Sequence, residues 1–359
     1  MTTYNFNPGP SPLPKEVLDH AQKNMFNFEQ SGMGLMELSH RSALYEQVHN
    51  QTISDLRDIL EVPEDFSVLL LQGGASLQFS MIALNFLGND QKAAYVMTGS
   101  WSEKAKKEAD FYGETYVLAT SKENQYKSIP DVPLQDLKND TAYLHFTSNN
   151  TIFGTQIRSF PETDIPVIVD MSSDILSKSV DWNTVDLAYA GAQKNAGMSG
   201  VTVVIIRNSL LEKASDKVSP SLSYKQHAKS NSLYNTPPTA AIYMTGLVCD
   251  WIKKNGAIEG MTERASRKAG LLYDEIDGSE GFYTGHAEAD ARSFMNVTFN
   301  LPTEELEKNF LAQAKEKGFV GLNGHRSVGG CRASIYNAVP VSHVETLVSF
   351  MKAFRTENQ

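Results

Sequence analysis

The chain has 359 residues, 41% of them hydrophobic and 21% charged, which is typical of a folded globular protein and excludes a largely disordered one. This length favours two domains over one. The net charge of −10 argues against nucleic acid or an anionic membrane surface as a partner, so an anionic ligand would need a local cluster of cations.

Cysteine usage and hydropathy favour a cytoplasmic protein. Cys249 and Cys331 are the only cysteines, and their spacing fits neither a disulfide framework nor a zinc motif. No signal peptide and no apolar run of membrane-spanning length is evident. A metal site is therefore not expected.

The first part of the chain is predicted to be an extended arm followed by two helices. Residues 5–14 contain four prolines and cannot form a helix. One helix is predicted from about residue 15 to 25, and a second opens just after His40 and Arg41 and ends near residue 60. A histidine and an arginine before a helix start can hold an anion, because backbone N–H groups there point outward. The alternative is a solvated helix cap.

The middle of the chain alternates strands and helices, the pattern of a largely parallel sheet covered by helices. Strands are predicted at residues 66–71, 93–97, 116–119, 142–146, 166–170, 185–189 and 201–206. Helices are predicted from the turn at 72–77 to about 87, at 102–112 and at 239–254. Residues 215–232 show little regular pattern.

Several polar or aromatic side chains follow these strands, at the sheet edge where ligands bind in open α/β proteins. The turn at 73–76, Gly-Gly-Ala-Ser, leads from a strand into a helix and can cradle a phosphate, although it matches neither the Walker nor the dinucleotide motif. Trp101 follows the strand at 93–97, and Asp170 ends the strand at 166–170. A polar loop reaching Thr151 follows a third strand. Each feature also has an ordinary structural explanation as a turn or a packed side chain.

Lys194 lies in the small-residue turn from Tyr189 to Asn195, between two predicted strands. Lysine is rarely buried without a partner. A lysine near apolar walls can lose its proton near neutral pH and attack an aldehyde. The alternative is an ordinary lysine in a surface loop.

From about residue 260 the pattern becomes that of a smaller α+β domain. Helices are predicted at 261–276 and 303–317, strands at 294–299 and 331–336, and a final helix that opens on a capping box at 342–345. A glycine-rich turn before the last strand carries His325, Arg326 and Arg332. Arg41 occurs in a second His-Arg context, so the arginines are clustered rather than scattered.

Together these residues meet the needs of one ligand, an aldehyde cofactor that carries a phosphate and a pyridine nitrogen. Such a cofactor needs a lysine for its aldehyde, a carboxylate for its ring nitrogen, an aromatic side chain for its ring and a helix N-terminus for its phosphate; substrate anions need arginines. The candidates, in that order, are Lys194, Asp170, Trp101, the turn at 73–76, and Arg41, Arg326 and Arg332. This combination points to pyridoxal 5′-phosphate.

Essentially the whole chain resembles the phosphoserine aminotransferases, which are class V, fold type I pyridoxal-phosphate enzymes. The segments that carry the resemblance are at 5–6, 9–10, 39–42, 73–75, 99–101, 170–173, 189–195, 234–238 and 324–337. Gly-Ala-Gln-Lys-Asn at 191–195 and the arginine-containing segment at 324–337 are specific to that family. The resemblance implies a fold type I α/β architecture, with a mixed, mostly parallel seven-stranded sheet between helices. It further implies an N-terminal arm at 1–14, a large cofactor-binding domain at 15–259 and a smaller α+β domain at 260–359.

The resemblance also implies a role for each cofactor-binding residue. Lys194 would form a Schiff base with pyridoxal 5′-phosphate and move a proton during catalysis, Asp170 would pair with the pyridinium nitrogen, and Trp101 would stack on the ring. The other contacts would be Ala75, Ser76 and Gln193 to the phosphate, Thr151 to the ring hydroxyl, and Asn235 and Thr236 to the phosphate of the neighbouring subunit's cofactor. The last pair implies a homodimer with shared active sites.

For the substrate, the resemblance implies that Arg332 clamps the α-carboxylate. The residues implied for the substrate's phosphate, or for the side-chain carboxylate of glutamate, are His40, Arg41, His325 and Arg326. Many family members have a serine where this chain has Pro8, so a hydroxyl group is missing at that position.

The implied reaction transfers the amino group of L-glutamate to 3-phosphooxypyruvate and gives O-phospho-L-serine and 2-oxoglutarate by a ping-pong mechanism. The pathway would be serine biosynthesis or, with a four-carbon phosphorylated analogue, pyridoxine synthesis. Two alternatives remain open. One is another class V enzyme, such as a serine or alanine–glyoxylate aminotransferase or a desulfurase. The other is a non-catalytic protein that binds phosphorylated metabolites and uses Lys194 structurally.

Overall fold

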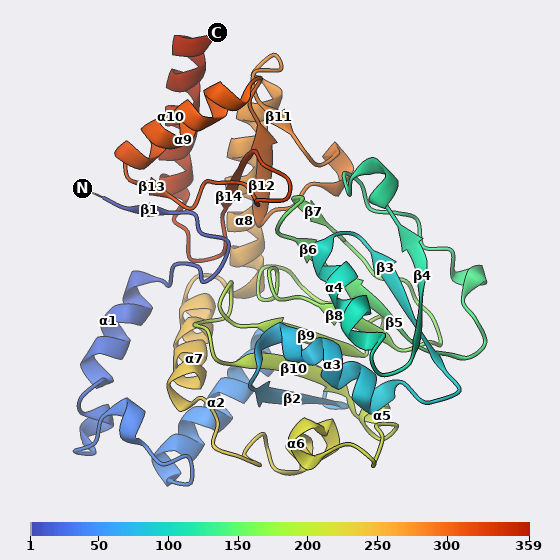
Figure 1. Cartoon of the computed structure of the whole chain (residues 1–359). Coiled ribbons are helices and arrows are strands. Elements are labelled where there is room, and N and C mark those ends of the chain that lie inside the picture. Colours follow the sequence, from blue (N-terminus) through green and yellow to red (C-terminus); the bar gives the residue numbers. More distant parts are fainter. Residues whose placement is uncertain (1) are drawn as a thin grey trace.

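A seven-stranded sheet forms the centre of the computed structural model, which describes residues 2–359 (Figure 1). The strand order is β2-β10-β9-β8-β5-β3-β4. The strands are β2 (Phe66–Leu71), β3 (Lys92–Met97), β4 (Glu114–Thr120), β5 (Thr141–Thr147), β8 (Val167–Asp170), β9 (Leu187–Gly191) and β10 (Thr202–Arg207). Within this sheet β10 is antiparallel to both of its neighbours, β2 and β9, and all other neighbouring strands are parallel. The predicted mixed, mostly parallel seven-stranded sheet is thus confirmed.

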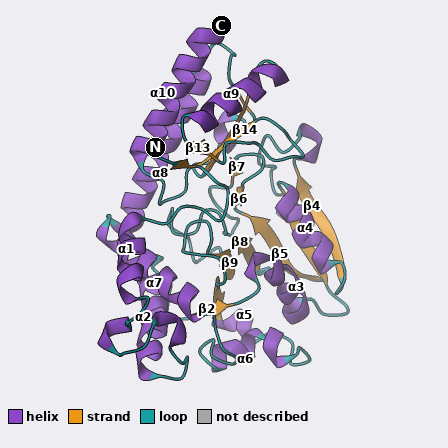
Figure 2. Cartoon of the chain, turned by 60° about the vertical axis from the view of Figure 1, so that its left-hand side comes forward, coloured by secondary structure: helices purple, strands orange, loops and turns teal. Residues whose placement is uncertain are grey.

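Helices cover both faces of the sheet (Figure 2). One face packs against α1 (Lys15–Asn24), α2 (Ala43–Ile59) and α7 (Thr239–Lys254). The other face packs against α3 (Gly74–Phe86), α4 (Ser100–Ala109), α5 (Asn208–Leu211) and α6 (Tyr224–Lys229). Successive strand residues point to opposite faces, so a strand buried on both sides needs a continuous apolar run.

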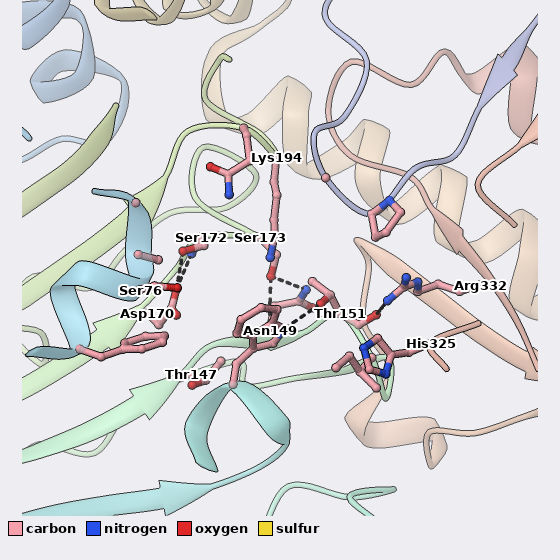
Figure 3. A pocket seen from close by; sticks show the side chains of 18 residues that line it. Ser76, Thr147, Asn149, Thr151, Asp170, Ser172, Ser173, Lys194, His325 and Arg332 are labelled. Atoms are coloured by element: carbon pink, nitrogen blue, oxygen red, sulfur yellow. Dashed lines mark hydrogen bonds between the residues drawn. The ribbon is translucent and has the colours of Figure 1, made fainter. Parts of the chain in front are cut away.

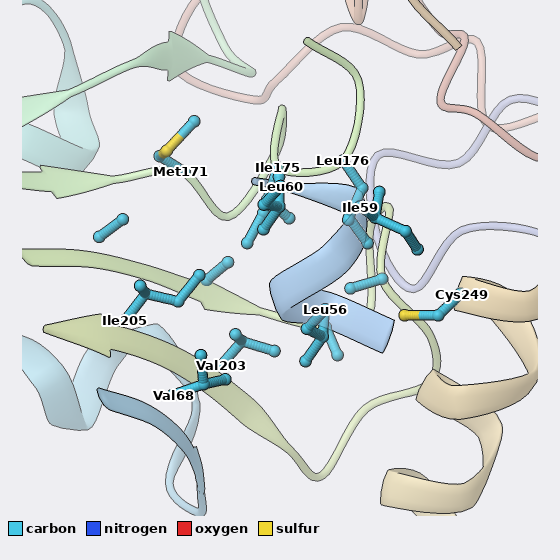
Figure 4. Packing of buried hydrophobic residues seen from close by; sticks show 14 of the residues in the cluster. Leu56, Ile59, Leu60, Val68, Met171, Ile175, Leu176, Val203, Ile205 and Cys249 are labelled. Atoms are coloured by element: carbon cyan, nitrogen blue, oxygen red, sulfur yellow. The ribbon is translucent and has the colours of Figure 1, made fainter. Parts of the chain in front are cut away.

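The β-branched run of β10 illustrates this rule. Val203 and Ile205 belong to the first core, and Val204 and Ile206 belong to the second. Figure 4 shows Val203 and Ile205 with Leu56 of α2 and Cys249 of α7 close by. The central strands therefore form a rigid platform whose carboxyl ends can hold side chains in fixed positions.

The C-terminal part has its own hydrophobic core. Its helices are α8 (Ala257–Asp277), α9 (Glu304–Glu316) and α10 (Val341–Asn358), and its antiparallel sheet consists of β11 (Thr284–Gly285), β12 (Asn296–Asn300) and β14 (Cys331–Ser334). The arm joins this core, because β1 (Tyr4–Asn5) pairs with β13 (Phe319–Val320) and Phe6 is buried in it.

Helix α8 contributes to both the large and the small core. Ile258 and Met261 pack in the large core, whereas Ala269 and Leu272 pack in the small one. We propose to keep the division into an arm at 1–14, a large domain at 15–259 and a small domain at 260–359, with the second boundary falling in the first turn of α8.

Shorter elements complete the chain. β6 (Asn149–Asn150) and β7 (Thr155–Gln156) form a hairpin beyond β5. The 3-10 turns are Phe28–Gln30, Leu35–Glu37, Lys122–Asn124, Leu134–Asp136, Pro220–Leu222 and Ala289–Ala291. Within residues 2–359, no helix is both long and apolar enough to cross a membrane.

Three local predictions are wrong. The segment 215–232 contains α6, which Ser223 caps and which is too short to show a helical period. Helix α10 begins after Pro340 and has no side-chain cap, so the predicted capping box at 342–345 is not formed. Helix α4 begins before Trp101 rather than after it, and the hydroxyl of Ser102 caps its start by accepting hydrogen bonds from the N–H groups of Thr98 and Gly99.

Candidate active site

A cavity of about 300 Å³ lies at the carboxyl ends of β2, β3, β5 and β8 (Figure 3). Its volume falls in the range of small-molecule sites, about 300–1,000 Å³. The predicted residues that line it are Ala75, Ser76, Trp101, Thr151, Asp170, Gln193, Lys194, His325 and Arg332. Asp170 and Ser76 lie to one side of the Lys194 side chain, and Arg332 and His325 lie to the other.

The first residues of α3 form a cradle for an anion. Gly73 and Gly74 have left-handed φ angles of 89° and 66°, which side chains rarely adopt. A Cβ on Gly73 would come within 2.3 Å of the Leu77 side chain, so this turn requires glycine. The N–H groups of Ala75 and Ser76 have no backbone acceptor among the described residues. Free N–H groups and the positive end of the helix dipole favour a phosphate here.

Asp170 presents one carboxylate oxygen to the cavity. Its side chain is 6% exposed, and Oδ1 accepts hydrogen bonds from the N–H of Ser172 at 2.9 Å and from its hydroxyl at 2.6 Å. Oδ2 has no hydrogen-bond partner among residues 2–359. Burial raises the pKa of Asp170, and the bonds from Ser172 and the charge of Lys194 oppose that shift. A protonated ring nitrogen in the cavity would give the free oxygen a partner and keep the carboxyl ionised.

The backbone around Lys194 is held by the N-terminal arm. The N–H of Ser11 donates to the carbonyl of Gln193 at 2.9 Å, and the hydroxyl of Ser11 donates to the carbonyl of Lys194. A Cβ placed on Gly9 would lie 3.2 Å from Cγ of Lys194, so the arm runs in contact with the lysine side chain. The arm therefore restricts the directions in which this side chain can point.

The amine of Lys194 is free within the described chain. Its Nζ lies 5.6 Å from the centre of the Trp101 ring and makes no hydrogen bond or ion pair with residues 2–359. Burial lowers the pKa of Lys194, an effect that Asp170 opposes and Arg332 reinforces. A larger fraction of this amine is therefore neutral near pH 7 than in an exposed lysine, as a nucleophile requires.

Trp101, Thr151 and Arg332 form a connected wall. The indole N–H of Trp101 donates to Oγ1 of Thr151 at 3.2 Å, and Nη1 of Arg332 donates to the carbonyl of Thr151 at 2.8 Å. Arg332 is 6% exposed, and its Nε has no hydrogen-bond partner among the described residues. A buried guanidinium with unused donors is suited to a carboxylate in the cavity.

His325 lies at the mouth of the cavity. Its Nδ1 is 2.6 Å from the hydroxyl of Ser327. Partial burial lowers the pKa of His325, and the positive charges of Arg332 and Arg326 reinforce the shift. Its two neighbouring arginines therefore carry most of the positive charge at this end of the cavity.

Five residues implied by the family resemblance do not line the cavity of this chain. They are His40, Arg41, Asn235, Thr236 and Arg326. Arg41 and Arg326 are exposed, the latter next to His325 on the same turn. The carbonyl of Thr236 accepts a hydrogen bond from Gln72 at 2.9 Å, which brings the loop at 234–238 beside the glycine turn but outside the cavity.

The cavity also has walls to which the sequence assigned no role. Ser172 holds the carboxylate of Asp170 by two hydrogen bonds. Its position just beyond the carboxyl end of β8 is the feature of the sequence that could have identified it as a site residue. Asn149 begins β6, in the polar segment that follows β5, and its side-chain amide donates to the hydroxyl of Ser173 at 2.8 Å. Pro8 and Gly9 come from the arm, and nothing local in the sequence indicates that they approach Lys194.

Comparisons with known proteins agree with this geometry. The family model for class V aminotransferases matches residues 3–347. A phosphoserine aminotransferase of Lysinibacillus sphaericus is 57% identical over 99% of both chains. The structure of phosphoserine aminotransferase from Bacillus circulans subsp. alkalophilus is 51% identical, with a TM-score of 0.97 over 100% of this chain and 99% of the other.

A more distant structure comes from Trichomonas vaginalis and is a phosphoserine aminotransferase with bound pyridoxal phosphate. It is 35% identical, with a TM-score of 0.93 over 98% of this chain and 100% of that one. Sequence identity above 50% over nearly the whole length, as with the first two proteins, establishes that the chain is homologous to them. The chain belongs to the phosphoserine aminotransferase family of the class V aminotransferases.

Proposed function

We propose that this protein is a pyridoxal-phosphate-dependent transaminase that moves the amino group of L-glutamate to 3-phosphooxypyruvate. The observation that carries the proposal is that one cavity contains two groups without a hydrogen-bond partner among the described residues, the amine of Lys194 and one carboxylate oxygen of Asp170. The 57% identical relative named above supports the choice of substrates.

The residues of the cavity fit the cofactor. Pyridoxal phosphate, when bound, supplies an aldehyde that bonds to an amine and a ring that accepts an electron pair. Asp170 would hold a proton on the ring nitrogen through its free oxygen. The N–H groups at the start of α3, with Ser76 and Gln193, would hold the phosphate. Trp101, fixed by Thr151, would orient the ring.

Lys194 has two tasks in this proposal. Its amine would hold the cofactor through the aldehyde, and Nζ would take the proton from the α-carbon of the substrate. Both tasks require a neutral amine, and burial of Lys194 increases the neutral fraction. The arm and Trp101 restrict the side chain to the cavity, so Nζ stays within reach of the proton it moves.

Substrate recognition rests on arginine. Arg332 holds the α-carboxylate from its buried position beside Thr151. His325, which lines the cavity, and Arg326, which is exposed beside it on the same turn, would receive the phosphate of one substrate and the side-chain carboxylate of the other. Guanidinium groups suit both anions, because their donors form charge-assisted bonds with carboxylates and with phosphates.

We further propose a homodimer in which a second chain completes each site. None of His40, Arg41, Asn235 and Thr236 lines the chain's own cavity. Large apolar side chains lie exposed in the segment that precedes His40, among them Phe26, which is 83% exposed, and Met36. Several exposed large apolar side chains in one segment favour a protein interface there. The cytoplasmic location stays a prediction from cysteine usage.

A panel of amino donors and keto acceptors tests the proposal. The purified protein with pyridoxal phosphate is offered glutamate, serine and alanine as donors, and 3-phosphooxypyruvate, its four-carbon analogue and glyoxylate as acceptors. We expect glutamate with 3-phosphooxypyruvate to give the highest kcat/KM. Borohydride should attach the cofactor's mass to Lys194, and the molar mass in solution should be twice 39.7 kDa. A glyoxylate preference would favour another class V enzyme, and a colourless protein without trapped cofactor would favour a binding protein.

Arg326→Ala should discriminate between phosphorylated and unphosphorylated acceptors. Removing one charge-assisted hydrogen bond to phosphate should lower kcat/KM for 3-phosphooxypyruvate by about 10- to 100-fold. For pyruvate the change should stay within about threefold, because that acceptor has no phosphate to lose. Arg267→Ala, which removes an exposed arginine paired with Glu345 on α10, is the control. Equal losses with both acceptors would contradict a phosphate site at Arg326.

A further inference from the structure

Lys268 is a completely buried lysine that lies outside the cavity. It is on α8, which in Figure 1 runs beside the small sheet toward α7. The side chain is 0% exposed, and within residues 2–359 it has no carboxylate partner. Burial lowers the pKa of Lys268 well below that of an ordinary lysine. An apolar side chain would be less costly at such a position, so a hydrogen-bonding role has to offset the cost.

The amine of Lys268 binds both ends of a single turn. Nζ donates to the carbonyl of Tyr336 at 2.6 Å and to the carbonyl of Val339 at 3.1 Å. The turn itself is closed by the N–H of Val339, which donates to the Tyr336 carbonyl at 3.0 Å. Lys268 thereby fixes the backbone of the whole segment from Tyr336 to Val339, which follows β14 directly.

That turn contacts the segment that carries Lys194. The N–H of Asn337 donates to Oδ1 of Asn195 at 2.9 Å, and Asn195 is the residue after Lys194. The side chain of Asn337 donates to the carbonyl of Leu176 at 2.7 Å, which anchors the turn to the loop after β8. Asn195 in turn donates to the carbonyl of Ser173 at 3.1 Å.

The same turn also holds the N-terminal arm. The hydroxyl of Tyr336 donates to the carbonyl of Pro8 at 2.8 Å. Pro8 is followed by Gly9, which touches the aliphatic part of Lys194, and both residues line the cavity. A single turn thus supports the backbone beside Lys194 and the arm that contacts its side chain.

We propose that Lys268 is a positioning residue for Lys194, acting through the turn from Tyr336 to Val339. It keeps the arm and Asn195 in place and so keeps the amine of Lys194 directed at the aldehyde and at the α-carbon proton. This inference rests on the proposed role of Lys194. Lys268 links α8, the helix that packs in both cores, to the amine of Lys194. The small domain would therefore help to set the geometry of the active site.

Lys268→Met tests the proposal, because methionine keeps a similar length and loses the donor. We expect kcat to fall by about 10- to 100-fold, since small misplacements of reacting groups cost this much, while KM for glutamate changes by less than threefold. The apo protein should bind pyridoxal phosphate covalently at least about 10-fold more slowly, measured by absorbance. The pH midpoint of the absorbance change of the bound cofactor should also move.

Tyr283→Phe is the matched control. Tyr283 is buried in the same small core and donates to the carbonyl of Met351 at 2.9 Å, far along the sequence from the turn. The Tyr283→Phe variant should have a lower Tm than the wild type but the same rate of covalent cofactor binding. If Lys268→Met does not fold, Tyr336→Phe provides the test, because it keeps the ring and removes the hydroxyl that donates to Pro8 and accepts from Asn296 at 3.2 Å; it should slow covalent binding in the same direction.

Two outcomes would overturn the inference. One is a Lys268→Met protein that binds the cofactor and turns over at wild-type rates. The other is an equal slowing in Tyr283→Phe, which would reduce the effect to general destabilisation. A wild-type protein that borohydride does not label at Lys194 would instead refute the proposed function, so the two failures are distinguishable.

Discussion

Lys194→Ala is expected to lower kcat by about 10²–10⁴-fold, the range for loss of a positioned acid–base group. The variant loses the amine that we propose to move the substrate's α-proton and to bond to the aldehyde. The cofactor should still bind at the α3 cradle and beside Asp170, because these contacts do not involve Lys194. Transamination is measured in both directions by coupled assay, and cofactor binding by absorbance with and without borohydride.

Lys92→Ala serves as the control for this experiment. Lys92 begins β3, at the opposite end of the strand from the cavity, and lies within 3.5 Å of Glu114 and Asp140. Its loss should leave kcat and borohydride labelling unchanged. Full turnover in Lys194→Ala, or covalent labelling at another lysine, would mean that the reactive amine has been misassigned.

Asp170→Asn is expected to lower kcat by about 10²–10³-fold, the size of effect seen when one preorganised electrostatic contact is removed from an active site. The amide keeps the shape of the side chain but cannot hold a proton on the ring nitrogen, so the ring accepts electrons less well. Proton removal should then limit the rate more strongly. The measurement is the kinetic isotope effect with α-deuterated glutamate, which should rise in the variant.

Asp186→Asn is the matched control for charge removal. Asp186 lies at the other end of the sheet, where it accepts hydrogen bonds from the N–H of Val167 at 2.9 Å and from Arg207 at 2.8 Å. This variant should lose stability but keep the wild-type isotope effect. An unchanged isotope effect and kcat in Asp170→Asn would show that the ring nitrogen does not depend on this carboxylate.

Local patterns in the sequence predict most of the fold. The strands of the large sheet are apolar or β-branched runs bounded by turn residues, and the observed β2, β3, β5, β8 and β10 begin and end within a residue or two of the predictions. Helix α6 escaped prediction because six residues do not complete a periodic pattern. Helix starts were predicted less well, since Ser102 accepts from backbone N–H groups that only the folded turn brings to it, and α10 begins after Pro340 without a side-chain cap.

The sequence by itself determined which residues are proposed to carry the chemistry, because Lys194, Asp170, Trp101 and the glycine turn each follow a strand that the hydrophobic pattern identifies, and the structure brings them to one cavity. The local pattern did not separate Arg332 from Arg41 and Arg326, because all three lie in short segments that contain a His-Arg pair; only the family resemblance gave Arg332 a role of its own. Only the tertiary structure shows that Arg332 is buried in the cavity wall while the other two are exposed. Burial depends on contacts between distant segments, and a local pattern contains no information about them.

The support of Lys194 was likewise decided by the tertiary structure. The arm, α8 and the turn after β14 are far apart in the chain, and they meet at Lys194 because the small domain packs on the carboxyl ends of the large sheet. In the sequence, Lys268 is one more lysine of an amphipathic helix. Its role follows only from the carbonyl groups that the folded chain directs toward it.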